Sequence, residues 1–116
     1  MLNYLIYHNK SATCIDDITV YIKVENKIIE DILFSGIGCA ISTSSTDIMC
    51  HQLIGKSIDI ANQIIDNYLT MIQGEKQYDE EILDELIAFY RIHEQTNRIK
   101  CATIGIIAIK NCLKEL

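Results

Sequence analysis

The chain contains no proline and no tryptophan, and only five of its 116 residues are glycine. Without proline-rich or glycine-rich linkers, low-complexity segments or repeats, nothing in the sequence marks a boundary between domains. A chain of this length buries roughly two thirds of its unfolded surface around one core. We therefore expect residues 1–116 to form a single domain.

The sequence also lacks the run of about 18 to 20 apolar residues that a membrane-spanning helix requires. Its first residues, MLNYLIYHNKS, have neither a basic start nor the apolar core and small-residue cleavage site of a secretory signal. These absences predict a cytoplasmic protein with no membrane partner.

Positive charge is scarce, because ten Lys and Arg residues oppose sixteen Asp and Glu, for a formal net charge of −6. Binding to a phosphate backbone depends on cationic side chains, so nucleic acid is not expected as a partner. The acidity is concentrated in EKQYDEEILDELIAFYRIHE, residues 75–94. We interpret this segment mainly as a solvated helix face, with a docking surface for a basic partner as the alternative.

Hydrophobic periodicity predicts strands first and helices afterwards. Residues 18–25 (ITVYIKVE) alternate apolar and polar side chains, as a half-buried strand does, and residues 27–34 follow after Asn26, which suits a tight reversal. A third short strand is expected at residues 39–42.

Capping residues and glycines delimit the predicted helices. One helix should end at Gly55, the next should run from a Ser57 cap to Gly74, and another should begin at Asp79. A final helix is expected from about residue 99 to residue 113. Together these elements predict an α+β fold, in which a small three-stranded antiparallel sheet packs against about four helices.

Five cysteines carry the strongest chemical signal, and they are Cys14, Cys39, Cys50, Cys101 and Cys112. An odd number in a chain without a secretory signal favours ligands, reactive thiols or small core residues over disulfides. Two of them, Cys50 and Cys112, lie within predicted helices and have no charged or glycine-rich setting, so we interpret them as core residues.

The other three cysteines have settings that favour a ligand role. Cys14 and Asp16 are two residues apart, so on an extended backbone their side chains point the same way. Cys39 follows glycines in GIGCA, and Cys101 lies near a predicted helix N-terminus beside Arg98, which favours the thiolate. Three thiolates and one carboxylate suit a tetrahedral site for zinc or iron-sulfur chemistry. Because no CxxC pair is present, small buried core cysteines are the alternative.

Four motifs, taken in order, resemble the U-type iron-sulfur cluster assembly scaffold family, which comprises IscU, SufU and the N-terminal part of NifU. They are TCID, GIGCAISTSS, IGKS and RIKCAT, and the resemblance extends over residues 10–113. The segment MIQGEKQYDEEILDELIAFYRIHEQTN resembles the insertion of the SufU branch. Lys100 also stands where IscU members carry a histidine, so SufU is the nearer branch, and the implied fold is SufE/IscU-like.

The resemblance implies specific roles for the site residues. The ligands of a metal ion or nascent cluster would be Cys14, Asp16, Cys39 and Cys101. Cys14 would be the first candidate to accept a persulfide sulfur, and Arg98 would lie near the site and offset its negative charge. The group held would be Zn²⁺ or a transient 2Fe-2S cluster.

The implied function is that of a scaffold, rather than a true enzyme, for assembly and transfer of iron-sulfur clusters. Its partners would be a SufS-like cysteine desulfurase and apo iron-sulfur proteins. An alternative within the family is a zinc-dependent sulfurtransferase of the SufU type that accepts persulfide sulfur on Cys14. An alternative of another class is a zinc-stabilised interaction module without transfer activity.

Overall fold

The computed structural model describes residues 4–10, 16–75 and 77–115. Its main elements follow one another along the chain as β1 (Leu5–Lys10), β2 (Asp17–Glu25), β3 (Ile28–Ile37), α1 (Ala40–Leu53), α2 (Ile58–Ile72), α3 (Glu80–Leu83) and α4 (Thr96–Lys114). Two 3₁₀ segments, η1 (Asp84–Phe89) and η2 (Ile92–Glu94), separate α3 from α4. The predicted α+β fold with a three-stranded antiparallel sheet and four α-helices is confirmed.

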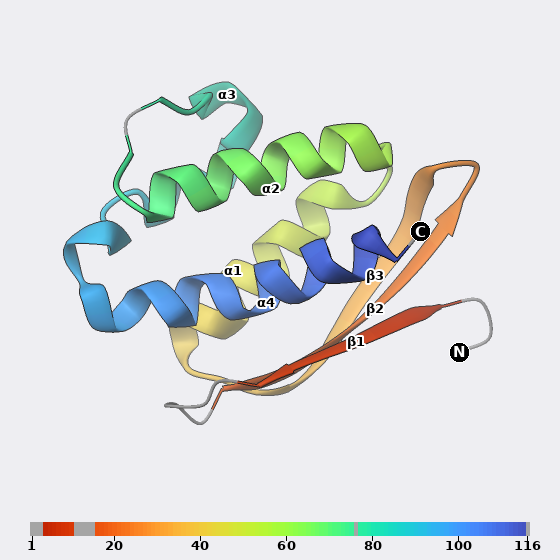
Figure 1. The fold of residues 1–116 in the computed structure, drawn as a ribbon, viewed down its shortest axis with the longest axis horizontal. Coiled ribbons are helices and arrows are strands. Elements are labelled where there is room, and N and C mark those ends of the chain that lie inside the picture. The colour runs from red at the N-terminus through yellow and green to blue at the C-terminus, as the bar shows by residue number, and fades with distance from the viewer. Residues whose placement is uncertain (1–3, 11–15, 76, 116) are drawn as a thin grey trace.

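The helices lie on one face of the sheet, whose strands are ordered β1-β2-β3 (Figure 1). Helices α1 and α4 pack against the strands and against each other, and α2 packs on α4. The inward-facing residues of β2 are Ile18, Val20 and Ile22, each no more than 1% exposed. The core therefore lies between the sheet and the α1–α4 pair. None of the described helices is long and apolar enough to cross a membrane.

The reversal between β2 and β3 is the one expected at Asn26. Asn26 and Lys27 have positive φ angles of 54° and 63°. Two successive residues with positive φ form the tight turn whose twist matches that of an antiparallel hairpin. Pairing then continues to Ile37, which lies opposite Asp17.

The prediction of a strand at residues 39–42 is wrong, because the third strand is β1, in which Leu5 lies opposite Ile22 of β2. Cys39 has an extended backbone, with φ −71° and ψ 172°, but it is the N-cap of α1. The serine and threonine side chains that follow donate to carbonyls of the preceding turn, as Thr46 does to Ser42 at 2.7 Å. The hydroxyl-rich run is thus compatible with the helix that contains it.

The acidic segment contains less α-helix than its apolar periodicity predicts. Asp79 caps α3 as expected, and its carboxylate accepts a hydrogen bond from the Glu81 N–H at 3.0 Å. The helix then ends at Leu83, because Asp84 has a φ angle of 48°. The chain continues as the 3₁₀ segments, and α4 begins at Thr96, three residues earlier than predicted.

Helices α1 and α4 are in close contact where Thr46 faces Gly105. A Cβ atom at Gly105 would lie 1.8 Å from Thr46 Oγ1 and 2.7 Å from its Cγ2, so only glycine fits at this crossing. The contact fixes the distance between two helices that carry Cys39 and Cys101 at the same end of the molecule.

Candidate metal centre

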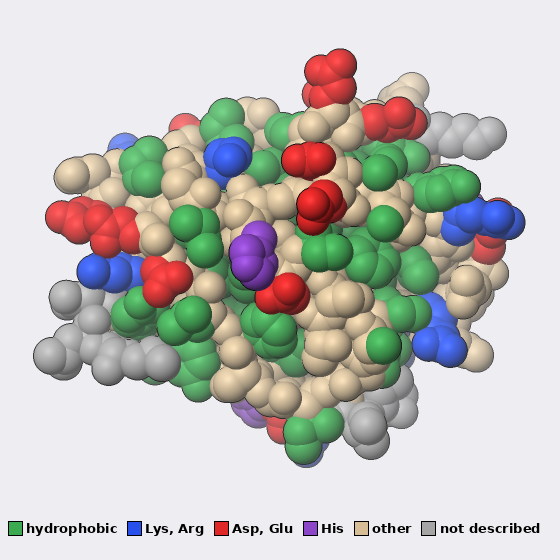
Figure 2. Space-filling model, turned by 180° about the vertical axis from the view of Figure 1, so that it is seen from behind, with side chains coloured by type: hydrophobic (Ala, Val, Ile, Leu, Met, Phe, Trp, Pro, Cys, Tyr) green, Lys and Arg blue, Asp and Glu red, His purple; other side chains and the backbone are tan. Residues whose placement is uncertain are grey.

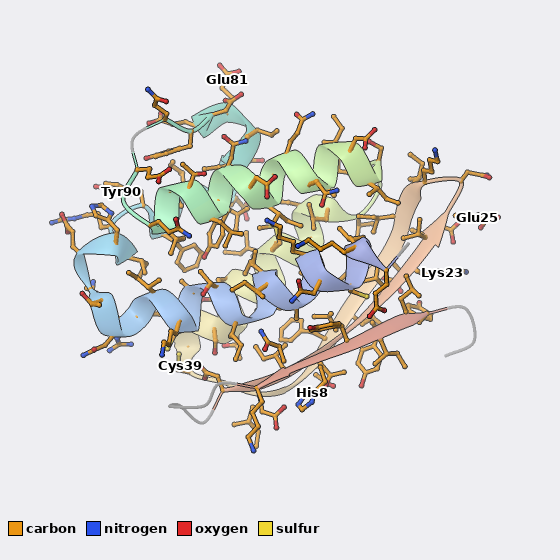
Figure 3. All side chains as sticks on the ribbon, in the orientation of Figure 1. His8, Lys23, Glu25, Cys39, Glu81 and Tyr90 are labelled. Atoms are coloured by element: carbon orange, nitrogen blue, oxygen red, sulfur yellow. The ribbon has the colours of Figure 1, made fainter. Side chains whose placement is uncertain are left out.

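Three of the four predicted ligands converge from separate elements. Asp16 immediately precedes β2, Cys39 precedes α1 as its N-cap, and Cys101 lies in the second turn of α4. One carboxylate oxygen and the two Sγ atoms all lie within 4.8 Å of one another. Figure 3 shows Cys39 at the end of the molecule where the sheet leads into α1. The fourth predicted ligand, Cys14, lies outside the described residues.

Asp16 is a buried carboxylate whose position is fixed by hydrogen bonds. Asp16 is 1% exposed. Its Oδ1 atom accepts hydrogen bonds from the Cys39 N–H at 2.9 Å and from the Ser42 hydroxyl at 3.2 Å. Buried carboxylates require such donors, and here the donors also hold Asp16 beside Cys39.

Two glycines make this close packing sterically feasible, as the sequence predicted. Gly36 has a φ angle of +127°, and a Cβ atom there would lie 1.9 Å from the Asp17 carbonyl oxygen. A Cβ atom at Gly38 would lie 2.3 Å from Ser42 Oγ and 3.4 Å from Asp16 Oδ1. Any larger residue at position 38 would therefore displace the group that positions the carboxylate.

The Cys39 thiol is set up to ionise. Partial burial is the largest single influence, and it would raise the pKa of this thiol. Hydrogen bonds from the N–H and hydroxyl groups of Ser42, from the Cys101 side chain and from the Ile41 N–H lower the pKa, and together they outweigh burial. The Ser42 N–H donates to Cys39 Sγ at 3.5 Å. The net effect is a pKa below that of an ordinary cysteine, which favours a nucleophilic or metal-binding thiolate.

The Cys101 thiol has the opposite tendency. Its pKa is raised to about 12, mainly by burial and further by the hydrogen bonds and negative charges of the Cys39 and Asp16 side chains. Two anions beside one thiol keep its proton in place, whereas a divalent cation among the three groups would favour its loss. The arrangement is thus a cluster of acidic groups that a cation would stabilise.

Arg98 and the two cysteines predicted to be core residues lie outside the cluster of Asp16, Cys39 and Cys101. Arg98 lies exposed in the first turn of α4, one turn before Cys101, and makes no ion pair in the part of the chain that the structure describes. Cys50 is 4% exposed and Cys112 is fully buried, so their interpretation as core residues is confirmed. Burial raises the pKa of the Cys50 thiol to about 12.

Ser42 is the residue of this centre that sequence reasoning missed. It is fully buried, and its hydroxyl also donates to the Cys39 carbonyl at 3.0 Å. The available signal was its spacing, because the third residue of a helix follows the N-cap by three positions and can exchange hydrogen bonds with it. In a run of five serines and threonines, that signal did not single out one hydroxyl.

Comparisons with known proteins find NifU-like, IscU and SufU relatives. The family model described as the NifU-like N terminal domain matches residues 6–115. Over 112 residues the chain is 31% identical to the iron-sulfur cluster assembly scaffold protein IscU of Thermotoga maritima, with 97% of this chain and 78% of the relative covered. Over 113 residues it is 34% identical to the zinc-dependent sulfurtransferase SufU of Bacillus subtilis, with 96% and 76% covered.

A solved structure supports the same relationship. The crystal structure described as a putative iron-sulfur cluster assembly scaffold protein for the SUF system from Fervidobacterium islandicum superposes with a TM-score of 0.92 at 32% identity. The match covers 97% of this chain and 83% of that one. The predicted resemblance is therefore confirmed in both sequence and fold.

Proposed function

The chain belongs to the NifU-like N-terminal domain family of U-type iron-sulfur cluster scaffolds, and from this membership we propose that it is a scaffold for cluster assembly and transfer. The observation that carries the proposal is the convergence of Asp16, Cys39 and Cys101 within 4.8 Å. Cys14 is proposed as the fourth ligand, because it precedes Asp16 by two residues.

The donor set fits a thiophilic metal. Zn–S bonds of about 2.3 Å in a tetrahedral site place two sulfur atoms about 3.8 Å apart. The three groups lie within 4.8 Å of one another, so Asp16, Cys39 and Cys101 could hold one such ion together. Asp16 would be a ligand held in place by the Cys39 N–H and the Ser42 hydroxyl, which both donate to its Oδ1.

The balance of charge and ligand type supports a site that exchanges its contents. Three thiolates and one carboxylate around a divalent ion leave an excess of negative charge, which we propose Arg98 offsets from the first turn of α4. A carboxylate binds soft metals less firmly than a thiolate does. Asp16 would therefore be the ligand that is released when a cluster leaves or when a thiolate must react.

Sulfur would be delivered by a SufS-like cysteine desulfurase. In this step the Cys14 thiolate attacks the outer sulfur of the donor persulfide, the new S–S bond forms on Cys14, and the donor cysteine leaves as a thiolate. Apo iron-sulfur proteins would take the finished cluster. We place this chemistry in the cytoplasm, where reduced thiols persist, and assign it to residues 1–116 acting as one domain.

A second candidate function is that of a zinc-dependent sulfurtransferase, which the similarity to SufU and the acidic insertion favour. In that role a resident zinc ion would hold the thiolates deprotonated, and Cys14 would relay sulfur without building a cluster. Both functions use the same residues, and they differ in whether the site holds zinc or a cluster as cargo. A zinc-stabilised module without transfer activity would retain metal but would not stimulate a desulfurase.

The test is the content of zinc, iron and acid-labile sulfide in untagged protein purified anaerobically. Iron with matching sulfide supports the scaffold, and about one zinc per chain without sulfide supports the sulfurtransferase. Cys39→Ala and Cys101→Ala should each release the metal, whereas the matched control Cys50→Ala should retain it. Full retention in both site variants would refute the metal centre.

A further inference from the structure

A pocket lies at the end of α1 that is opposite to Cys39. The end of α1, the first half of α2 and the α3–η1 segment enclose a volume of about 480 Å³. It is lined by His51, Gln52, Lys56, Ile60, Ile64, Glu81, Ile82, Asp84 and Glu85. Gln52 is thirteen positions after Cys39 along the helix, so the pocket lies about 20 Å from the metal centre.

Gln52 lines this pocket and has an unpaired carboxamide. Both its Oε1 and Nε2 atoms are buried, and neither meets a hydrogen-bond partner among the residues that the structure describes. Buried polar atoms without partners destabilise a fold, so they are normally paired. The carboxamide offers both an acceptor and a donor. A complementary ligand therefore has to supply both an N–H and a C=O group.

The rim of the pocket is acidic. Glu81, Asp84 and Glu85 oppose the single cation of Lys56, and none of the three carboxylates forms an ion pair in the described part of the chain. Glu81 points outward at the edge of α3 (Figure 3). Acidic side chains lie beside hydrophobic ones on the face that Figure 2 shows. The charge favours a cationic ligand.

The floor of the pocket is apolar. Ile60, Ile64 and Ile82 line it, and Ile60 remains 40% exposed. A small inorganic cation would satisfy the carboxylates but would leave this surface uncovered and the Gln52 N–H donors unpaired. A ligand with a hydrocarbon stem, a cationic end and a peptide group matches all three features.

We propose that this pocket binds a basic polypeptide segment of a partner protein. An arginine or lysine of that segment extends its aliphatic stem over the isoleucines and its charge toward Asp84 and Glu85. The backbone peptide group of the same segment pairs with the Gln52 carboxamide once that side chain has turned from its buried position toward the pocket. Another copy of this chain is a poor match, because its net charge of −6 is of the same sign as the rim.

The proposal is tested by NMR titration of the full chain with N-acetyl-arginine N-methylamide, which has a guanidinium group and two peptide groups. We expect saturable shifts of the Gln52 side-chain NH₂ signals with a dissociation constant on the order of 1 mM. Butylguanidine has the cation and its stem without peptide groups, and N-acetyl-leucine N-methylamide has peptide groups without the cation. Equal shifts with either of these compounds would overturn the proposal.

Variants separate binding from folding. Gln52→Met removes two unpaired buried polar atoms, so it should keep or raise the thermal midpoint while it weakens probe binding at least about tenfold. Asp84→Asn with Glu85→Gln should weaken binding at least about threefold; asparagine accepts the φ of 48° at position 84. Glu94→Gln changes an exposed carboxylate outside the pocket lining and is the matched control. Unchanged binding in Gln52→Met would overturn the proposal.

Discussion

Replacing Gly105 by alanine tests whether the α1–α4 crossing controls the metal centre. The added Cβ atom would lie 1.8, 2.7 and 2.8 Å from three side-chain atoms of Thr46. Thr46 is fully buried, and its hydroxyl is bonded to the Ser42 carbonyl. The side chain therefore has little freedom to turn away, and the helices have to separate.

The magnitude follows from two opposing effects. Overpacking a core costs about 1–3 kcal/mol, and a contact of 1.8 Å places this site at the upper end. Alanine recovers up to about 1 kcal/mol of helix propensity relative to glycine. We expect a net loss of about 2 kcal/mol, which lowers the thermal midpoint by roughly 8 °C in a domain of this size.

The assay is thermal and urea unfolding of metal-free protein, so that metal binding does not contribute to the measured stability. Thr46→Ala removes the two nearest atoms, so the double variant should be less unstable than the two single changes predict, by more than about 1 kcal/mol. Gly105→Ala should also reduce the metal content of protein purified anaerobically. A variant as stable as the wild type, or additivity within about 0.5 kcal/mol, would refute the reasoning.

Three further predictions concern individual side chains. Ser42→Ala removes a hydrogen bond to Asp16 and should weaken metal retention in chelator competition about tenfold. The Ser44 hydroxyl donates only within α1, so Ser44→Ala should leave metal retention unchanged. Equal retention in both variants would contradict the positioning role of Ser42. In metal-free native protein, iodoacetamide should alkylate Cys39 before Cys50, as mapped by mass spectrometry, because the pKa of Cys39 is lowered and burial raises that of Cys50 to about 12; equal rates would argue against this difference. Burial raises the pKa of the Cys50 thiol from about 9 in the unfolded chain to about 12 in the folded one. The stability contributed by the protonated thiol is therefore complete below pH 9 and falls by about 1.4 kcal/mol per pH unit above it. Urea unfolding at pH 8 and pH 10 should show this loss relative to Cys50→Ala, and an equal change in the free energy of unfolding between the two pH values in both proteins would refute it.

The parts of the fold that sequence predicted are those with strong local signals. The β2–β3 hairpin follows from alternation and from Asn26, and α2 follows from its apolar stripe and from Ser57, whose hydroxyl accepts from the Ile60 N–H at 3.2 Å. Strand β1 was missed because it is short and its outward side chains, such as Ile6, are not consistently polar. The end of α3 depends on the positive φ of Asp84, which its sequence neighbours do not indicate.

The metal centre shows the same division between local and tertiary information. The glycines beside Cys39 indicated a close approach, and the motifs indicated which residues would meet. The geometry itself depends on the α1–α4 crossing at Gly105, where a glycine inside a helical pattern gave no specific warning. The role of Ser42 also required the structure, because its partner Asp16 is 26 residues away.

The N-cap of α1 couples the chemistry of the site to the backbone of a helix. Cys39 Sγ accepts a hydrogen bond from the Ser42 N–H, so the atom that would bind metal also protects one amide proton. Electron density that the sulfur gives to a metal ion or to a new bond is withdrawn from that amide. The hydrogen-exchange rate of a single backbone proton is thus a natural reporter of whether the site is loaded, readable without any label on the metal or the sulfur.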